Sequence, residues 1–272
     1  MSINAVILAA GYGTRLERDL KNDESGQYSH LIGTPKPLLP IGHLPLISHW
    51  IESFVIVPDI KKITVVINDL HKPRYEEWVS SLRSNLSCVV ELISDGSTCN
   101  EERSGAVACM RLGAATDAGH TIYVAGDTLL RDDFTLGDVV KRFQELQQKK
   151  SLNSLVLCAP VAESNVSKHG IIEVNDSGLV AHFLEKPQPS ETSSRLQCPC
   201  FYILSHTSHQ YLENFIQDTK GLPISARDAT GMFISHLITC APVYAYSVTG
   251  RYDVGGLQSY IECHQEFLKK SN

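Results

Sequence analysis

The sequence predicts an α/β fold built on a doubly wound, mostly parallel sheet. Short apolar runs recur along the first 160 residues, and amphipathic segments lie between them. The composition, with 43% hydrophobic and 20% charged residues over 272 positions, is that of a globular protein. Strands that alternate with helices need right-handed crossover connections, which place helices on both faces of a parallel sheet.

The apolar runs of the first half are typical of strands, several of them buried on both faces. We expect strands at residues 4–10, 62–67, 88–93, 121–125 and 154–159. The clearest helix is predicted by LGDVVKRFQELQQKK, which ends in two lysines, as suits a helix carboxyl end. Its apolar face would hold Leu136, Val139, Val140, Phe143 and Leu146.

The pattern changes after about residue 160. The stretch GIIEVNDSGLVAHFLEKP predicts a hairpin, because two apolar runs flank an Asn-Asp-Ser-Gly turn. Further elements are expected as a strand at 201–204, a helix from about Ser208, a strand near 243–246 and a last helix at about 257–269. No repeat, low-complexity linker or clear boundary interrupts the chain, so we expect a single domain over residues 1–272.

Composition also excludes some classes of protein. The net charge of −6 argues against a general nucleic-acid binder, and no apolar stretch approaches the roughly 20 residues of a membrane span. The amino terminus lacks the features of a signal peptide. The eight cysteines are scattered, mostly within apolar runs, which favours buried reduced thiols. We therefore expect a cytoplasmic protein without nucleic-acid or membrane partners.

Two early motifs suggest phosphate binding. In LAAGYGTRL, a strand followed by Gly11-Tyr12-Gly13 can bring backbone amides to a phosphate, although a plain tight turn explains it nearly as well. Arg15 would be a fixed cation beside a polyphosphate, whereas the third glycine of a dinucleotide fingerprint is absent. In TPKPLLPI, two prolines stiffen the chain around Lys36, which could also be a solvated lysine.

Three later motifs place charged side chains at predicted element ends. Asp127 follows an apolar strand, where open α/β sheets bind ligands and where a carboxylate can hold Mg²⁺; a helix cap is the alternative. Glu185 and Lys186 end the predicted hairpin, where a surface ion pair is the alternative. Asp253 precedes a double glycine and the last helix, and could also be a capping residue.

Taken in this order, the five motifs resemble those of the sugar-1-phosphate nucleotidylyltransferases, the NDP-sugar pyrophosphorylases. The resemblance spans Ala5 to about Phe267. It implies a mixed, mostly parallel Rossmann-like sheet of the nucleotide-diphospho-sugar transferase type. It also implies Mg²⁺-dependent transfer of a nucleotidyl group from a nucleoside triphosphate to a sugar 1-phosphate, which releases pyrophosphate. Residues up to about 160 would form the nucleotide-binding half, and residues 161–272 the acceptor-binding half.

The same resemblance implies roles for the matching residues. The nucleotide would lie against Ala10, Gly11, Gly13, Thr14, Arg15 and Gly105. Arg15, Lys36 and Asp127 would act on the reacting phosphates. The acceptor would be bound by Gly170, Glu185 and Lys186, with His169 beside them. Asp127 and Asp253 would share the Mg²⁺.

Some properties stay open at this stage. Arg15 and Lys36 stand 21 positions apart, about twice what the resemblance leads us to expect, and the polar segment 17–34 between them is predicted to be mobile until a ligand or partner subunit orders it. A homo-oligomer is therefore an option. The segment before Gly105 and the presence of Cys200 leave the base and the acceptor undefined.

Alternative functions also stay open. One is cytidylyl transfer to a non-sugar phosphate such as phosphocholine, and another is a non-catalytic regulatory subunit that binds nucleotide sugars. A metal-dependent glycosyltransferase would usually carry Asp-x-Asp, whereas Asp127 is followed by Thr128-Leu129.

Overall fold

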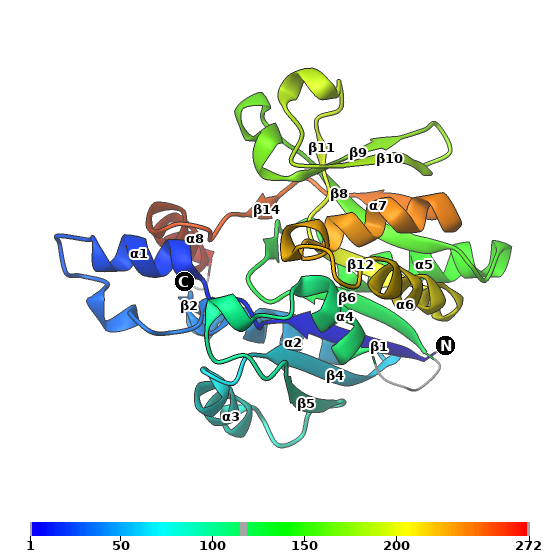
Figure 1. The fold of residues 1–272 in the computed structure, drawn as a ribbon. Helices are drawn as coiled ribbons and strands as arrows, with labels where there is room; N and C mark the ends of the chain where they lie inside the picture. The colour runs from blue at the N-terminus through cyan, green and yellow to red at the C-terminus, as the bar shows by residue number, and fades with distance from the viewer. Residues whose placement is uncertain (1, 115–118, 271–272) are drawn as a thin grey trace.

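The computed structural model describes residues 2–114 and 119–270, and a ten-stranded mixed sheet runs through them (Figure 1). The strands of this sheet are β1 (Ile3–Leu8), β4 (Ile60–Ile67), β5 (Val89–Ser94), β6 (His120–Ala125), β8 (Ser154–Pro160), β9 (Gly170–Val174), β10 (Val180–Glu185), β11 (Leu196–Gln197), β12 (Phe201–Leu204) and β13 (Val243–Ser247). Their order is β10-β9-β11-β8-β12-β6-β1-β4-β5, and β13 pairs with β8.

The sheet is parallel in its first half and antiparallel around its later strands. β1 runs parallel to β4 and β6, and β4 runs parallel to β5. β12 is antiparallel to both β6 and β8, and β9 and β10 form the predicted hairpin. The mixed, largely parallel sheet is thus confirmed. The predicted bounds of the early strands differ from the observed ones by one or two residues. β1 ends at Leu8, two residues before the predicted end, because the chain turns away toward Gly11 after the Ala9 amide bonds to the Val66 carbonyl (2.8 Å).

Helices cover both faces of the sheet, as the predicted double winding requires. On one face lie α2 (Leu46–Val55), α3 (Lys72–Ser81) and α5 (Leu136–Lys149), and on the other lie α4 (Ala106–Gly113), α6 (His209–Asp218) and α7 (Thr230–Cys240). Successive residues of β1 alternate between the two cores: Ala5 and Ile7 face the first, and Val6 faces the second. Burial on both faces explains why these strands are almost wholly apolar.

A third, smaller core joins the two ends of the chain. It brings together α1 (Thr14–Lys21), α8 (Leu257–Lys270), β2 (Pro40–Ile41), β3 (Leu44–Pro45), β7 (Leu129–Leu130) and β14 (Arg251–Tyr252). β2 pairs with β3, and β14 pairs with β7, so the segment before α8 is tied to the turn that follows β6. In Figure 1, α1 and α8 lie together at the left of the sheet.

The polar segment 17–34 is more regular than its composition predicts. α1 continues to Lys21, a 3₁₀ turn covers Ser29–Leu31, and Leu20 and Leu31 are buried in the third core. The Gly33 amide donates to the Glu17 carboxylate (3.0 Å), which ties the two ends of the segment together. Two leucines thus anchor the segment, and its mobility stays a prediction.

The cysteines agree with the predicted reduced, mostly buried thiols. All eight cysteines are free thiols, and five of them are buried. Within residues 2–114 and 119–270, no helix combines the length and apolar character that a membrane crossing requires.

Candidate active site

A cavity of about 670 Å³ opens where the parallel strands β1 and β6 end. Its walls come from the loop after β1, the turn after β6 and the β9–β10 hairpin, so both halves of the chain contribute. The predicted site residues on its walls are Ala10, Gly11, Gly13, Lys36, Gly105, Asp127, Gly170, Glu185 and Lys186.

A second cavity of about 740 Å³ adjoins the first, and Lys36, Asp127 and Lys186 line both. Arg15 and Asp253 line this second cavity. Thr14 lines neither and instead borders a smaller hollow beside α1. The structure therefore brings together every predicted site residue except Thr14.

The glycine loop is held in place by buried side chains that the sequence did not single out. Asn68 donates to the Ala10 carbonyl (3.0 Å), and the Tyr75 hydroxyl donates to the Ala9 carbonyl (3.1 Å). Gly13 has a φ of +60°, a left-handed conformation that favours glycine, and it turns the chain into α1. The backbone of the loop thus lines the cavity directly in front of a helix amino terminus, a setting that suits anions.

Lys36 and Asp127 form an ion pair on the wall of both cavities. Lys36 Nζ lies 2.8 Å from Asp127 Oδ2, and the lysine side chain is only 16% exposed. Burial opposes ionisation of Asp127, but Lys36 and Arg251 outweigh it, so the pKa of this carboxyl is lowered and it is ionised at neutral pH. Lys36 begins a 3₁₀ turn between two prolines, which fixes its backbone as predicted.

The two predicted metal ligands lie on the wall of the same cavity. Asp253 is exposed, and its Oδ1 accepts the Gly255 amide (2.9 Å). No group of three or more His, Cys, Asp or Glu side chains suited to a metal occurs in the described part of the chain. Two carboxylates in a cavity that adjoins the glycine loop still fit Mg²⁺, which keeps several waters and takes one or two carboxylates together with substrate phosphates.

Glu185 and Lys186 line the first cavity at the end of β10. Lys186 has a φ of +52°, and it is the one non-glycine residue among those described with a left-handed backbone. Its amide donates to the His169 carbonyl (3.1 Å), and its side chain is 61% exposed, with Nζ 3.9 Å from Glu185 Oε1. Strain of this kind is found preferentially at functional sites. The free ammonium group is accessible to an anion in the cavity.

The Glu185 carboxylate packs against the first turn of α7. A Cβ on Gly231 would stand 2.2 Å from Glu185 Oε2 and 2.6 Å from the Phe183 ring, so only glycine leaves room there. Burial raises the pKa of Glu185, and the nearby Lys186 opposes that shift. A half-buried carboxyl held this way is a fixed acceptor for hydroxyl groups.

Gly105 meets the second half of the chain through a residue that the sequence analysis missed. Asp228 accepts the Ala106 amide at the start of α4 (3.0 Å) and also pairs with Arg103 (3.1 Å). It thereby joins the loop before α4 to the segment before α7. Asp228 and Ala106 are 122 positions apart, so no local pattern could have found this contact.

Arg251 is the second residue that the sequence analysis missed. It lines both cavities, and its guanidinium contacts Gln197 and His169. Burial and the Arg251 charge lower the pKa of His169 to about 4, so its imidazole is neutral at physiological pH.

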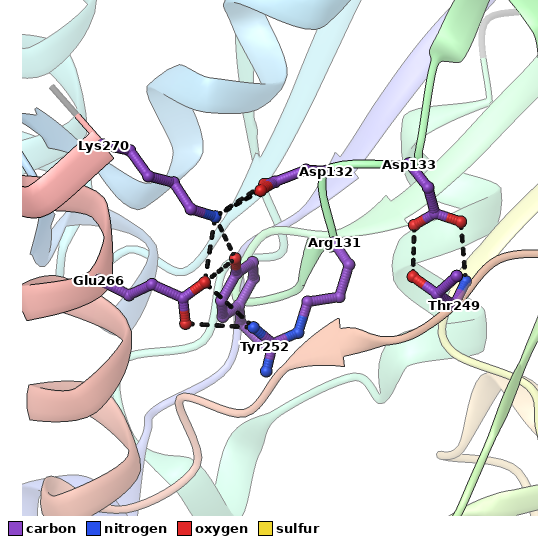
Figure 2. Close-up of polar contacts among 7 residues, drawn as sticks. All are labelled: Arg131, Asp132, Asp133, Thr249, Tyr252, Glu266 and Lys270. Atoms are coloured by element: carbon purple, nitrogen blue, oxygen red, sulfur yellow. Dashed lines mark hydrogen bonds and ion pairs between the residues drawn. The ribbon is translucent and has the colours of Figure 1, made fainter.

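A polar network fixes the segment that carries Arg251 and Asp253 (Figure 2). Tyr252, which is 3% exposed, lies under the Arg131 guanidinium (4.0 Å to the ring centre). Its hydroxyl donates to Glu266 (2.7 Å) and accepts from Lys270 (2.6 Å), both on α8. With the β7–β14 pairing, this network holds the Asp253 segment beside the turn that carries Asp127.

Comparisons with known proteins extend over nearly the whole chain. The model of the family "Nucleotidyl transferase" matches residues 4–270. Glucose-1-phosphate adenylyltransferase 2 of Vibrio parahaemolyticus is 24% identical over 97% of this chain and 66% of its own length. The bifunctional protein GlmU of Methanococcus maripaludis is 25% identical over 98% of this chain and 55% of its own length. The chain thus spans between about half and two thirds of these relatives.

The fold has close structural counterparts. A putative glucose-1-phosphate thymidylyltransferase from Bacillus anthracis, solved in complex with sucrose, superposes with a TM-score of 0.75 at 18% identity, over 98% of this chain and 96% of that one. This likeness confirms the predicted Rossmann-like sheet of the nucleotide-diphospho-sugar transferase type. With a family match over nearly all of its length, the chain belongs to the nucleotidyl transferase family.

Proposed function

We propose that the protein transfers a nucleotidyl group from a nucleoside triphosphate to a sugar 1-phosphate and releases pyrophosphate. The observation that carries this proposal is the position of the Lys36–Asp127 pair. It lies in a cavity whose walls also include the glycine loop, Glu185 and Lys186.

The reaction requires two anions to approach each other. An oxygen of the acceptor phosphate forms a bond to the α-phosphorus, and the bond from that phosphorus to the bridging oxygen of pyrophosphate breaks. Positioning and charge stabilisation are the main demands on the protein. The glycine loop and Arg15 would hold the triphosphate, and Lys186 would hold the acceptor phosphate.

Lys36 has the central role in this proposal. Its ion pair with Asp127 keeps the ammonium group near the place where the two substrates meet. When the substrates bind, Lys36 would exchange its bond to Asp127 for one to the α-phosphate and offset the charge that develops there. Asp127 and Asp253 would hold Mg²⁺, which when bound supplies further positive charge beside the phosphates.

Glu185 favours a sugar over a non-sugar acceptor. A buried carboxylate, fixed against Gly231, suits the hydroxyl groups of a sugar ring. The names of the relatives, which include a glucose-1-phosphate adenylyltransferase, support the same acceptor class.

A pyrophosphate-release screen tests the proposal directly. Four nucleoside triphosphates would each be combined with glucose 1-phosphate, other sugar 1-phosphates and phosphocholine, with and without Mg²⁺. Release with a sugar 1-phosphate is expected. Release with phosphocholine alone would favour the cytidylyltransferase alternative, and binding of nucleotide sugars without any turnover would favour the regulatory subunit.

A further inference from the structure

Arg251 lies on the cavity wall with its guanidinium already fixed by neutral partners. Its Nε donates to Gln197 Oε1 (3.0 Å), and its Nη2 lies 3.1 Å from His169 Nδ1. A guanidinium can only donate, so this ring nitrogen of the neutral His169 accepts the bond. The backbone of Arg251 is held as well, because it pairs with Leu130 in the β7–β14 ribbon.

The charge of Arg251 has no carboxylate partner of its own. Among the residues that the structure describes, Arg251 forms no ion pair, whereas Lys36 pairs with Asp127 and Lys186 lies near Glu185. Arg251 nevertheless stands at the junction of the two cavities, which it lines together with Lys186. The charge of Arg251 acts on Asp127 without a direct contact, and a fixed cation that no carboxylate contacts favours an anionic ligand.

The anchors of Arg251 belong to the acceptor side of the cavity. The backbone carbonyl of His169 accepts the Lys186 amide (3.1 Å), so the same residue orients both cations. Gln197 pairs with Ile171, next to Gly170 on β9. The glycine loop lines only the first cavity and Arg15 only the second, and under the proposed function both would bind the triphosphate.

We propose that Arg251 binds the phosphate group of the acceptor together with Lys186, and that Gln197 and His169 are positioning residues for its guanidinium. This inference rests on the proposed function, and it assigns Arg251 to the phosphate group of the acceptor. The planar fork of an arginine can bind two phosphate oxygens at once, which a lysine cannot do. Because Gln197 and His169 already hold the side chain, little of its freedom is lost when the anion binds.

The test compares Arg251→Gln, Arg251→Lys and Gln197→Leu with the wild type. Arg142→Gln is the matched control, since Arg142 forms a surface ion pair with Glu145 on α5. Glucose 1-phosphate and inorganic phosphate are titrated into each protein by calorimetry. KM for the sugar 1-phosphate and for the nucleoside triphosphate are measured in parallel, and melting temperatures report folding.

Arg251→Gln is expected to weaken glucose 1-phosphate binding, and to raise the acceptor KM, by about 10- to 100-fold, the loss of one charge-assisted contact. The triphosphate KM should stay within about twofold. Arg251→Lys should recover part of the affinity, and Gln197→Leu should lose a smaller, several-fold part.

Equal increases in both KM values would overturn the inference. So would an Arg251→Gln protein that binds the probes as well as Arg142→Gln does, or a wild type that binds neither probe. A wild type that binds glucose 1-phosphate through Arg251, yet releases no pyrophosphate with any triphosphate, would instead overturn the proposed function and leave the inference standing.

Discussion

The two halves of the cavity are built in different ways. On the side proposed to bind the nucleotide, the cavity is lined by backbone at the ends of parallel strands, and Asn68 and Tyr75 hold the glycine loop in place. On the acceptor side, it is formed by side chains at the end of an edge hairpin, among them Glu185 and Lys186. The first arrangement follows from the sheet itself, whereas the second depends on packing contacts such as that of Glu185 with Gly231.

This difference indicates how the two sides tolerate change. Backbone groups at a strand end tolerate changes in the side chains of the cavity surface as long as Asn68 and Tyr75 hold the loop, and a polyphosphate is common to every nucleoside triphosphate. Side chains at a hairpin end can be exchanged one at a time, which suits a site that has to distinguish acceptors. A substitution on one side should therefore change the KM of one substrate only. Substitutions of the residues between the two sides should affect the reaction of both substrates.

The largest effect is expected where the sides meet. Asp127→Asn and Asp253→Asn should each lower kcat by on the order of 10²–10³-fold, if a few kcal/mol of charge stabilisation is lost. Since both are proposed to serve one ion, the double variant should be little worse than the poorer single one. Turnover measured against Mg²⁺ concentration checks this. Asp176→Asn, in the exposed hairpin turn, is the control, and a single variant with near-normal Mg²⁺-dependent turnover would show that its carboxylate only caps a turn.

Lys186→Ala should affect one side only. Loss of a charge-assisted contact should raise the acceptor KM about tenfold or more and leave the triphosphate KM nearly unchanged. Steady-state kinetics with each substrate varied in turn decides the matter, with Lys141→Ala on the exposed face of α5 as control. An equal loss of affinity for both substrates would contradict the assignment.

Gly231→Ala should disturb the acceptor side through packing. The new methyl group would meet Glu185 and the buried Phe183 ring, at a cost of about 1–3 kcal/mol of stability, and the displaced carboxylate should raise the acceptor KM. In contrast, Gly137→Ala in α5 has open space and should stabilise the protein by up to about 1 kcal/mol. Urea unfolding of both variants measures the contrast. Equal stabilities of the two would mean that the close contact at Gly231 costs nothing.

The smallest effect is expected at the network that ties α8 to β14 (Figure 2). The Tyr252 hydrogen bond, together with Lys270 and Arg131, lowers the pKa of Glu266 to about 2. The contribution of ionised Glu266 to the stability of the fold should therefore be present above the ordinary glutamate pKa of about 4.3. It should be lost as the pH falls toward 2. Because the Arg131–Glu266 ion pair is partly exposed, Glu266→Gln should lower the free energy of unfolding by less than about 1 kcal/mol at pH 7.

Denaturant unfolding of the wild type and Glu266→Gln between pH 7 and pH 2.5 checks this. The stability difference should shrink as the pH falls. A difference that stays constant or grows would mean that Glu266 gains nothing from being ionised in the folded protein.

The sequence predicted what is encoded locally. Strands buried on both faces, the hairpin turn before Gly178 and the amphipathic face of α5 each leave a periodic or turn pattern, and all are found. Lys36 and Asp127 could be singled out because prolines and a strand end mark their surroundings. Leu20 and Leu31 could not be recognised as core residues within a polar segment, since their partners lie on α8 and in the strands near it.

Contacts across the fold left no such signal. Arg251 is one of several arginines in the sequence, and only the fold brings it to Gln197 and His169, the latter 82 positions away. Asp228 is likewise far along the chain from the Ala106 amide that it accepts at the start of α4.

Hydrogen exchange with each substrate alone tests the central claim most directly, namely that one side of the cavity binds the triphosphate and the other the acceptor. The ligands are the triphosphate and sugar 1-phosphate selected by the pyrophosphate-release screen. The triphosphate alone should slow exchange in peptides covering residues 8–16 and 100–106. The sugar 1-phosphate alone should slow exchange at residues 169–174 and 184–187. Protection of the same peptides by both substrates would contradict the account.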